Sequence, residues 1–261
     1  MIQQITSFLP TEIIVLERSF RGMQILSYQK AYGGNYGFCR FFRLRYPTGK
    51  GWMLLFNATL FICTEGKLPT DEIQSFVAMH MPFRVECDSF LVDDLLQLSS
   101  YQKLHRTTFH LVPKPLSDQF LESALNRIPR LDTVYQILKE GFPNLLEYGL
   151  WLTDASHRLR HGISKFFTYK DISTLAWQYD WNDTVLVGQV ATCSAHRGSG
   201  YARDLLRWTA NELSRNGKYA VLYALDVRDS FYREIGFQAI ATEYVLERQD
   251  IPKEKQEKGV L

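Results

Sequence analysis

The residues VATCSAHRGSGYA, positions 190–202, carry the pattern that decides the fold of this chain. They close an apolar run, TVLVGQVAT (184–192), which predicts a strand that is buried on both faces. The chain then turns through Gly198 and Gly200 and opens into a helix expected over 200–215. A buried strand, a glycine-containing turn and a helix in this order predict an α/β protein.

A turn of this kind is suited to bind an anion. Glycine has no Cβ, so the backbone at Gly198 and Gly200 can approach a ligand closely. The N–H groups in the first turn of the helix have no acceptor within the helix and favour an anion. Arg197 adds a positive charge. The segment therefore predicts a cradle for a pyrophosphate, with a plain strand-turn-helix connection as the alternative.

A second pattern, DSFYREIGF, stands at positions 229–237, after a strand expected over 219–226. Asp229 is expected to cap a short helix, and Gly236 to end it, before Phe237 starts the last strand. The helix carries Tyr232, which is either a functional hydroxyl or an aromatic residue of the core.

Together the two patterns resemble the GNAT family of acetyltransferases. The resemblance covers roughly residues 131–246 and is specific in 187–237. The pyrophosphate loop of the family, Q/R-x-x-G-x-G/A, matches residues 195–200, with Ala195 in place of Gln or Arg. The resemblance implies an α/β (α+β) fold with a mixed central sheet flanked by helices.

The resemblance also implies a reaction and a site. The chain would transfer an acetyl group from acetyl-coenzyme A to an amine by direct attack, without a metal. The backbone at Val190 and Thr192 would pair with the pantetheine arm and the acetyl group, and Tyr232 would protonate the leaving thiolate. The base stays open among Asp154, His157, Asp180 and His196. The residues implied for cofactor binding are Val190, Ala191, Thr192, Arg197, Gly198, Ser199, Gly200, Tyr201 and Ala202.

The rest of the second half reads as two helices, near 131–140 and 144–160, followed by strands over 163–169 and 172–179. The longer of the two helices places on one face Leu145, Leu146, Gly149, Leu150, Thr153 and His157. The later helix over 200–215 places on one face Ala202, Leu205, Leu206, Thr209 and Leu213.

The first half shows a parallel order of elements. It predicts a hairpin of strands over 37–46 and 51–63 and a helix over 70–79. A strand over 83–87, a helix near 90–98 and a strand near 104–112 follow. Acidic residues, and no glycine loop, open the helix over 70–79, so a pyrophosphate would be repelled there. We expect a degenerate GNAT-like half that lacks the cofactor, with an unrelated α/β substrate domain as the alternative.

Three prolines, Pro113, Pro115 and Pro129, mark the expected junction between the halves. The sequence therefore predicts an N-terminal α/β domain over residues 1–115 and a catalytic domain over 116–247. The charged residues 248–261 read as a flexible tail.

Composition limits the remaining possibilities. The formal net charge is only +2 and the basic residues form no long run, which argues against a nucleic-acid partner. No apolar run approaches the roughly 20 residues that span a bilayer, and the N-terminus lacks signal-peptide features. Four widely spaced cysteines argue against a zinc site and for the cytoplasm. The expected acceptor is a small-molecule or peptide amine, and a homodimer is compatible with the sequence. A non-catalytic protein that binds coenzyme A or an acyl derivative is the alternative function.

Overall fold

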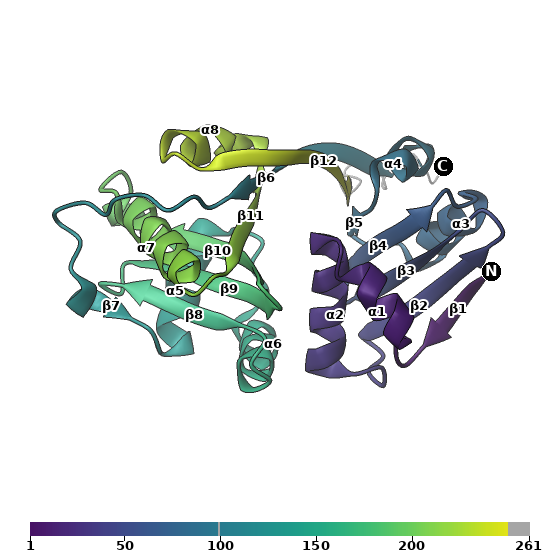
Figure 1. Ribbon diagram of the computed structural model, residues 1–261, viewed down its shortest axis with the longest axis horizontal. Helices are drawn as coiled ribbons and strands as arrows, with labels where there is room; N and C mark the ends of the chain where they lie inside the picture. Colours follow the sequence, from purple (N-terminus) through teal and green to yellow (C-terminus); the bar gives the residue numbers. More distant parts are fainter. Residues whose placement is uncertain (99, 250–261) are drawn as a thin grey trace, which may run out of the picture. The chain divides into compact units, whose positions relative to one another are not determined.

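The computed structural model describes residues 1–98 and 100–249 (Figure 1). The chain divides into two compact units, Met1–Arg106 together with the described chain from Glu243, and Thr107–Thr242. The division predicted at residue 115 stays a prediction. Of the predicted tail, the part from residue 250 lies outside the described residues. Within the described ranges, no helix is both long and apolar enough to cross a membrane.

The first unit is built on a mixed sheet with the strand order β1-β2-β3-β4-β5-β12-β6. One apolar core forms on this sheet, where α3 and α4 pack through Ile73, Val77 and Leu91. The elements of this unit are β1 (Ile2–Ile5), α1 (Pro10–Leu16), α2 (Phe20–Tyr32), β2 (Cys39–Tyr46), β3 (Gly49–Phe56), β4 (Thr59–Gly66), α3 (Asp71–His80), β5 (Arg84–Glu86), α4 (Ser89–Leu96) and β6 (Tyr101–His110), of which β6 continues into the second unit.

The single strand predicted over 51–63 is wrong, because the chain reverses at Asn57 and Ala58. Strands β3 and β4 flank this turn and pair antiparallel from Phe56↔Thr59 to Gly49↔Gly66. Asn57 takes a left-handed backbone conformation with φ 49°, which asparagine tolerates better than most residues. The first unit therefore has a three-stranded meander in place of the predicted hairpin.

The second unit has the strand order β12-β6-β11-β10-β9-β8-β7. Strand β12 begins in this unit and contributes its residues from Glu243 to the first unit. The elements are a 3₁₀ turn η1 (Glu122–Ala124), β7 (Leu125–Asn126), α5 (Leu131–Gly141), α6 (Tyr148–Arg160), β8 (Lys165–Tyr169), β9 (Ser173–Trp181), β10 (Thr184–Thr192), a 3₁₀ turn η2 (Ser194–His196), α7 (Tyr201–Arg215), β11 (Tyr219–Leu225), α8 (Asp226–Glu234) and β12 (Gln238–Arg248).

The two units share one order of elements when the short 3₁₀ turns are left aside. Each runs strand, two helices, three strands, helix, strand, helix, strand. In each, the strand before the second-last helix pairs parallel with the strand after it, β4 with β5 and β10 with β11. The parallel order predicted from the sequence is therefore confirmed, and the interpretation of the first unit as a degenerate copy stays a proposal.

Helices cover both faces of the sheet in the second unit. Helix α7 lies across the strands on one face (Figure 1) and buries Leu205, Leu206 and Leu213, as its sequence pattern predicts. Helices α5 and α6 cover the other face through residues such as Trp151. For α6 the predicted face is not the packed one, because Leu150 is 63% exposed while Trp151 is buried. The predicted class, a mixed sheet flanked by helices, is confirmed.

Helix α8 begins earlier than predicted, at Asp226, with Leu225 in the capping position. Asp229 is therefore not the N-cap. It lies inside the helix and accepts a hydrogen bond from Arg233 Nε at 2.5 Å, one turn further on. Asp226 and Asp229 both lie in the first turn of α8, where negative charge favours the start of a helix.

Candidate functional site

Strands β10 and β11 part halfway along their length. Their parallel pairing runs from Thr184↔Tyr219 to Val187↔Leu222. Both strands continue beyond this point, β10 to Thr192 and β11 to Leu225. Among the described residues, β10 from Gly188 on pairs with β9 and not with β11. The edge of β10 that faces β11 is therefore open over residues 188–192, and an extended ligand with amide groups could add there as a strand does.

A β-bulge accompanies the opening. The register between β10 and β9 shifts between Gly188 and Ala191. Within the bulge, Gln189 has a left-handed backbone with φ 51°, a conformation that is uncommon outside glycine. The sequence pattern gave no sign of this irregularity, because the strand over 184–192 reads as one apolar run.

The turn that follows β10 forms a cradle of backbone N–H groups. Gly198 and Gly200 both have positive φ, 80° and 83°, which only glycine adopts without strain. The first helical hydrogen bond of α7 runs from Asp204 N to Gly200 O. The N–H groups of Tyr201, Ala202 and Arg203 precede that bond, and no side chain caps them. The structure thus brings together at one helix start the predicted residues Gly198, Ser199, Gly200, Tyr201 and Ala202.

Arg197 braces this loop instead of reaching into the cradle. Its guanidinium donates to Thr192 O (3.2 Å) and, through Nη2, to Glu140 O (2.5 Å) at the end of α5. The Glu140 carboxylate in turn accepts from Ser194 N at 2.6 Å, which lowers the pKa of that carboxyl. Arg197 therefore provides the predicted positive charge beside the turn, and its guanidinium donates hydrogen bonds to backbone carbonyls.

Arg203 is a residue that the sequence analysis missed. Its guanidinium folds back over Gly200, so that a Cβ built on this glycine would lie 2.5 Å from Arg203 Nη2. Arg203 Nε also donates to Asp204 Oδ1 at 3.2 Å. A cation in the first turn of a helix is unfavourable unless an anion lies close by. The unusual position of this arginine, in the first turn after a glycine turn, was the available signal.

Tyr232 lies on α8 within the core of the second unit. Its ring centroid is 5.5 Å from that of Phe109 and 5.2 Å from that of Phe231. Burial raises the pKa of the Tyr232 hydroxyl to about 12. The hydroxyl therefore keeps its proton at neutral pH, and its predicted catalytic role stays a prediction.

The four candidate bases lie in different surroundings. Asp180 forms an ion pair with Lys218, and His196 is exposed in the turn before α7. His157, on α6, packs its ring against His161, just beyond the end of that helix. Asp154, also on α6, lines a small cavity beside the bulge in β10. Among the four, Asp154 is the one that this cavity brings next to β10.

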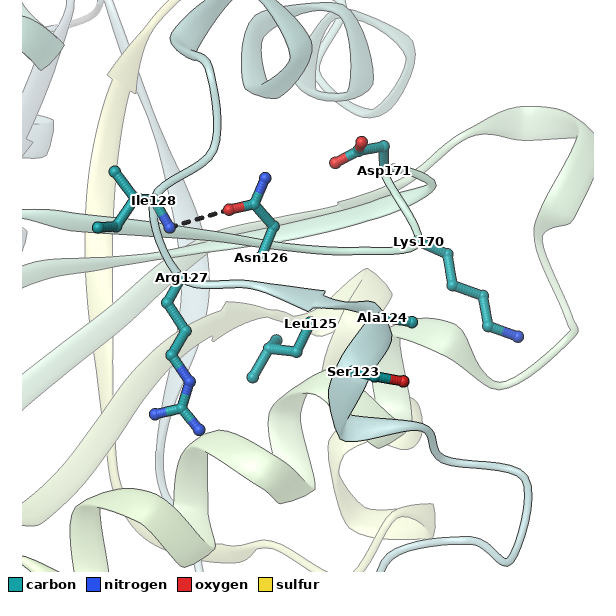
Figure 2. Close-up of a pocket in the computed structure, with 8 residues that line it drawn as sticks. All are labelled: Ser123, Ala124, Leu125, Asn126, Arg127, Ile128, Lys170 and Asp171. Atoms are coloured by element: carbon teal, nitrogen blue, oxygen red, sulfur yellow. Dashed lines mark hydrogen bonds between the residues drawn. The ribbon is translucent and has the colours of Figure 1, made fainter.

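A shallow groove of about 720 Å³ lies elsewhere in the second unit (Figure 2). It contains none of the predicted site residues. Lys170 links it with the cradle, because its ammonium lies 5.2 Å from the ring centroid of Tyr201. We therefore place the candidate site at the open edge of β10 and not in this groove, which is lined by Ser123, Ala124, Leu125, Asn126, Arg127, Ile128, Lys170 and Asp171.

In the first unit, side chains occupy the corresponding strand edge, that of β4 beyond its pairing with β5. Strands β4 and β5 pair from Thr59↔Arg84 to Phe61↔Glu86, and β4 then continues to Gly66. Over this continuation, the Asp88 carboxylate accepts from Thr64 N (2.9 Å) and Thr64 Oγ1 (2.6 Å). Arg21, buried beside it, forms an ion pair with Asp88. Side chains of the first unit thus occupy the edge that is open in the second.

Comparisons with known proteins agree on the fold. No protein-family model matches the chain, and no curated protein matches it. Several solved structures do. A GCN5-related N-acetyltransferase from Sphaerobacter thermophilus is 15% identical, with a TM-score of 0.60 over 95% of each chain. One from Kribbella flavida is 12% identical, with a TM-score of 0.55 over 94% of this chain and 98% of its own. A Drosophila protein is 10% identical, with a TM-score of 0.62 over 95% and 98%. The chain therefore has the fold of the GCN5-related N-acetyltransferases.

Proposed function

We propose that this chain is an acyltransferase that moves the acetyl group of acetyl-coenzyme A to an amine by direct attack. One observation carries the proposal: the pairing of β10 with β11 ends at Val187↔Leu222, and the glycine cradle at Gly198 and Gly200 follows β10 directly. An open strand edge and an anion-binding helix start, joined by one short turn, suit a ligand with both amide groups and a pyrophosphate. The shared fold supports the same proposal.

Different parts of the site would bind different parts of acetyl-coenzyme A. The open edge over residues 190–192 would pair with the amides of the pantetheine arm. The N–H groups from Gly198 to Ala202 would receive the pyrophosphate, with the positive charge of Arg203 beside Gly200. Arg197 would hold the turn in place through its bonds to Thr192 O and Glu140 O. Acetyl-coenzyme A supplies an acetyl group that is activated as a thioester.

The chain would then assist a single acyl transfer. The nitrogen–carbon bond of the product forms as the carbon–sulfur bond of the thioester breaks, the nitrogen gives up one proton to water, and the sulfur takes up one. A backbone N–H at the open edge, near Val190, would stabilise the negative charge that develops on the thioester oxygen. Tyr232 would donate a proton to the leaving sulfur, because its hydroxyl is protonated at neutral pH.

We also propose that the protein acts in the cytoplasm. The four cysteines form no disulfide within the described chain, and Cys39, Cys63 and Cys87 are buried. Cysteines that stay reduced are typical of proteins that work in a reducing compartment.

The test is release of coenzyme A from acetyl-coenzyme A in the presence of an amine panel. The panel contains alkylamines, polyamines, amino acids and short peptides with a free α-amine. We expect release above the rate without amine, and an acetylated product of matching mass. Calorimetric binding of acetyl-coenzyme A without turnover of any amine would instead support a non-catalytic binding protein. Absence of binding would contradict both functions.

A further inference from the structure

The bulge in β10 directs the side chain of Gln189 toward a small cavity. Val187 and Val190 pack on the face covered by α7, whereas Ala191 packs on the face covered by α5 and α6. Two residues, Gly188 and Gln189, lie between these valines, so the alternation of the strand is broken there. Gln189 points to the face of α6, where it lines a cavity together with Trp151, Asp154, Arg158 and Gln178.

The amide oxygen of Gln189 is buried and has no hydrogen-bond partner among the described residues. Burial of an unpaired polar oxygen costs about 1–3 kcal/mol, and the left-handed backbone at the same residue adds to the cost. Unpaired buried acceptors are rare in folded proteins and call for an explanation. A ligand that donates a hydrogen bond to this oxygen would provide one.

Two polar side chains around the cavity share one backbone acceptor. Ser164 Oγ donates to the backbone oxygen of Gln178 at 2.9 Å, and Arg158 Nη2 donates to the same oxygen. The Gln178 amide covers Gly188, where a Cβ would lie only 2.5 Å from Gln178 Nε2. Asp154 and Arg158 contribute one negative and one positive charge to the lining, so the lining carries no net formal charge and suits a neutral donor.

The size of the cavity limits what can enter. Its volume is about 20 Å³, which is room for one group of the size of a water molecule. A primary amino group fits this space, whereas an N-methyl substituent would add a second heavy atom. Gln189, which lines the cavity, directly precedes Val190, and the proposed function places the thioester at Val190.

We infer that Gln189 is a specificity-determining residue for the acceptor: its amide oxygen accepts a hydrogen bond from the attacking nitrogen, and the cavity around it admits primary amines and excludes N-substituted ones. This inference rests on the proposed function, because an attacking amine is present only if the chain is an acyltransferase.

Two coenzyme A adducts test the inference by binding alone. In the first, the sulfur carries a CH₂–CO–NH–ethyl group, so the amide nitrogen keeps one hydrogen. In the second, the same nitrogen carries an additional methyl group and has none. We expect the first adduct to bind the wild type at least about tenfold more tightly than the second, the effect of one well-placed hydrogen bond and a steric clash. Isothermal titration calorimetry measures both affinities.

Three variants assign the preference to Gln189. Gln189→Met keeps the length of the side chain without the acceptor oxygen, and we expect it to bind the two adducts within about twofold of each other, a difference too small for a hydrogen bond. Gln189→Glu keeps an acceptor oxygen and should retain the preference. Ser156→Ala is the matched control on α6, because Ser156 does not line the cavity and donates to Thr153 O.

The outcomes separate the two proposals. If neither coenzyme A nor either adduct binds, the proposed function itself is wrong. If coenzyme A binds and the wild type does not distinguish the adducts, the inference is overturned while the proposed function stands. This second result needs no variant, so it does not depend on how Gln189→Met folds. A preference that persists in Gln189→Met also overturns the inference.

Discussion

Val187 and Leu222 form the last parallel pair between β10 and β11, and beyond them the two strands run on apart. In the first unit the last pair is Phe61 and Glu86, and the edge beyond it is taken by the carboxylate of Asp88. The same order of elements therefore leaves one edge open and one edge closed. This difference assigns the two units different parts in the proposed function.

The first prediction concerns stoichiometry. Because Asp88 already accepts hydrogen bonds from the edge of β4, and acidic residues open α3, we expect one molecule of coenzyme A per chain. Titration calorimetry of the full chain measures the number of sites. Two equivalent sites would contradict the interpretation of the first unit as a half without cofactor.

A second prediction concerns Tyr232. Tyr232→Phe removes the proton and keeps the ring that packs on Phe109. Acetyl-coenzyme A should bind as in the wild type, while the turnover number falls by about 10²–10⁴, the usual contribution of a general acid. Tyr135→Phe is the matched control, because it removes a buried hydroxyl that donates to Leu146 O on the other face of the sheet. A Tyr232→Phe enzyme with wild-type turnover would show that the residue serves the core alone.

Tyr232 also predicts a response of stability to alkaline pH. Its pKa is raised to about 12 in the folded chain and is about 10 in an unfolded one. The folded state thus holds the proton more tightly, so the free energy of unfolding is unaffected below pH 10 and falls between about pH 10 and pH 12. Urea unfolding at several pH values measures this fall. Tyr232→Phe should show a smaller fall, and equal slopes for both proteins would contradict the burial of a protonated hydroxyl.

Much of the second unit could be predicted from its sequence, because local signals there agree with the packing. The apolar stripe of α7 and the glycines before it both follow from backbone and burial rules that act within a few residues. Leu205 and Leu213 are buried as expected, and Gly198 and Gly200 have the positive φ that turns of this kind need.

The features that were missed depend on pairing and not on residue type. Asn57 reverses the chain inside an apolar stretch that reads as one strand. The parting of β10 from β11 and the bulge at Gln189 leave no mark in an apolar run, because both are set by the neighbouring strands. On α6, Trp151 and Leu150 are adjacent apolar residues, and the periodicity alone did not decide which of them is buried.

Arg203 yields a prediction about cofactor affinity. If its guanidinium neutralises the bound anion at Gly200, Arg203→Ala should weaken binding of acetyl-coenzyme A by about tenfold, the loss of one charge-assisted contact at a half-exposed site. The wild-type affinity should also weaken as the salt concentration rises. Arg215→Ala at the other end of α7 is the control and should leave the affinity unchanged. Equal affinities for all three proteins would remove Arg203 from the site.

The central claim is that the start of α7 holds the anionic part of acetyl-coenzyme A. Gly200→Glu places a Cβ and a negative charge in the cradle. Gly217→Glu is the matched control, since it adds the same charge at a glycine that also has positive φ, 67°, just beyond the other end of the same helix. Calorimetry of both variants with acetyl-coenzyme A, alongside their melting temperatures, tests the claim most directly. We expect wild-type affinity in Gly217→Glu and a loss of at least about 100-fold, or roughly 2.7 kcal/mol, in Gly200→Glu. Equal affinity in two folded variants would contradict it.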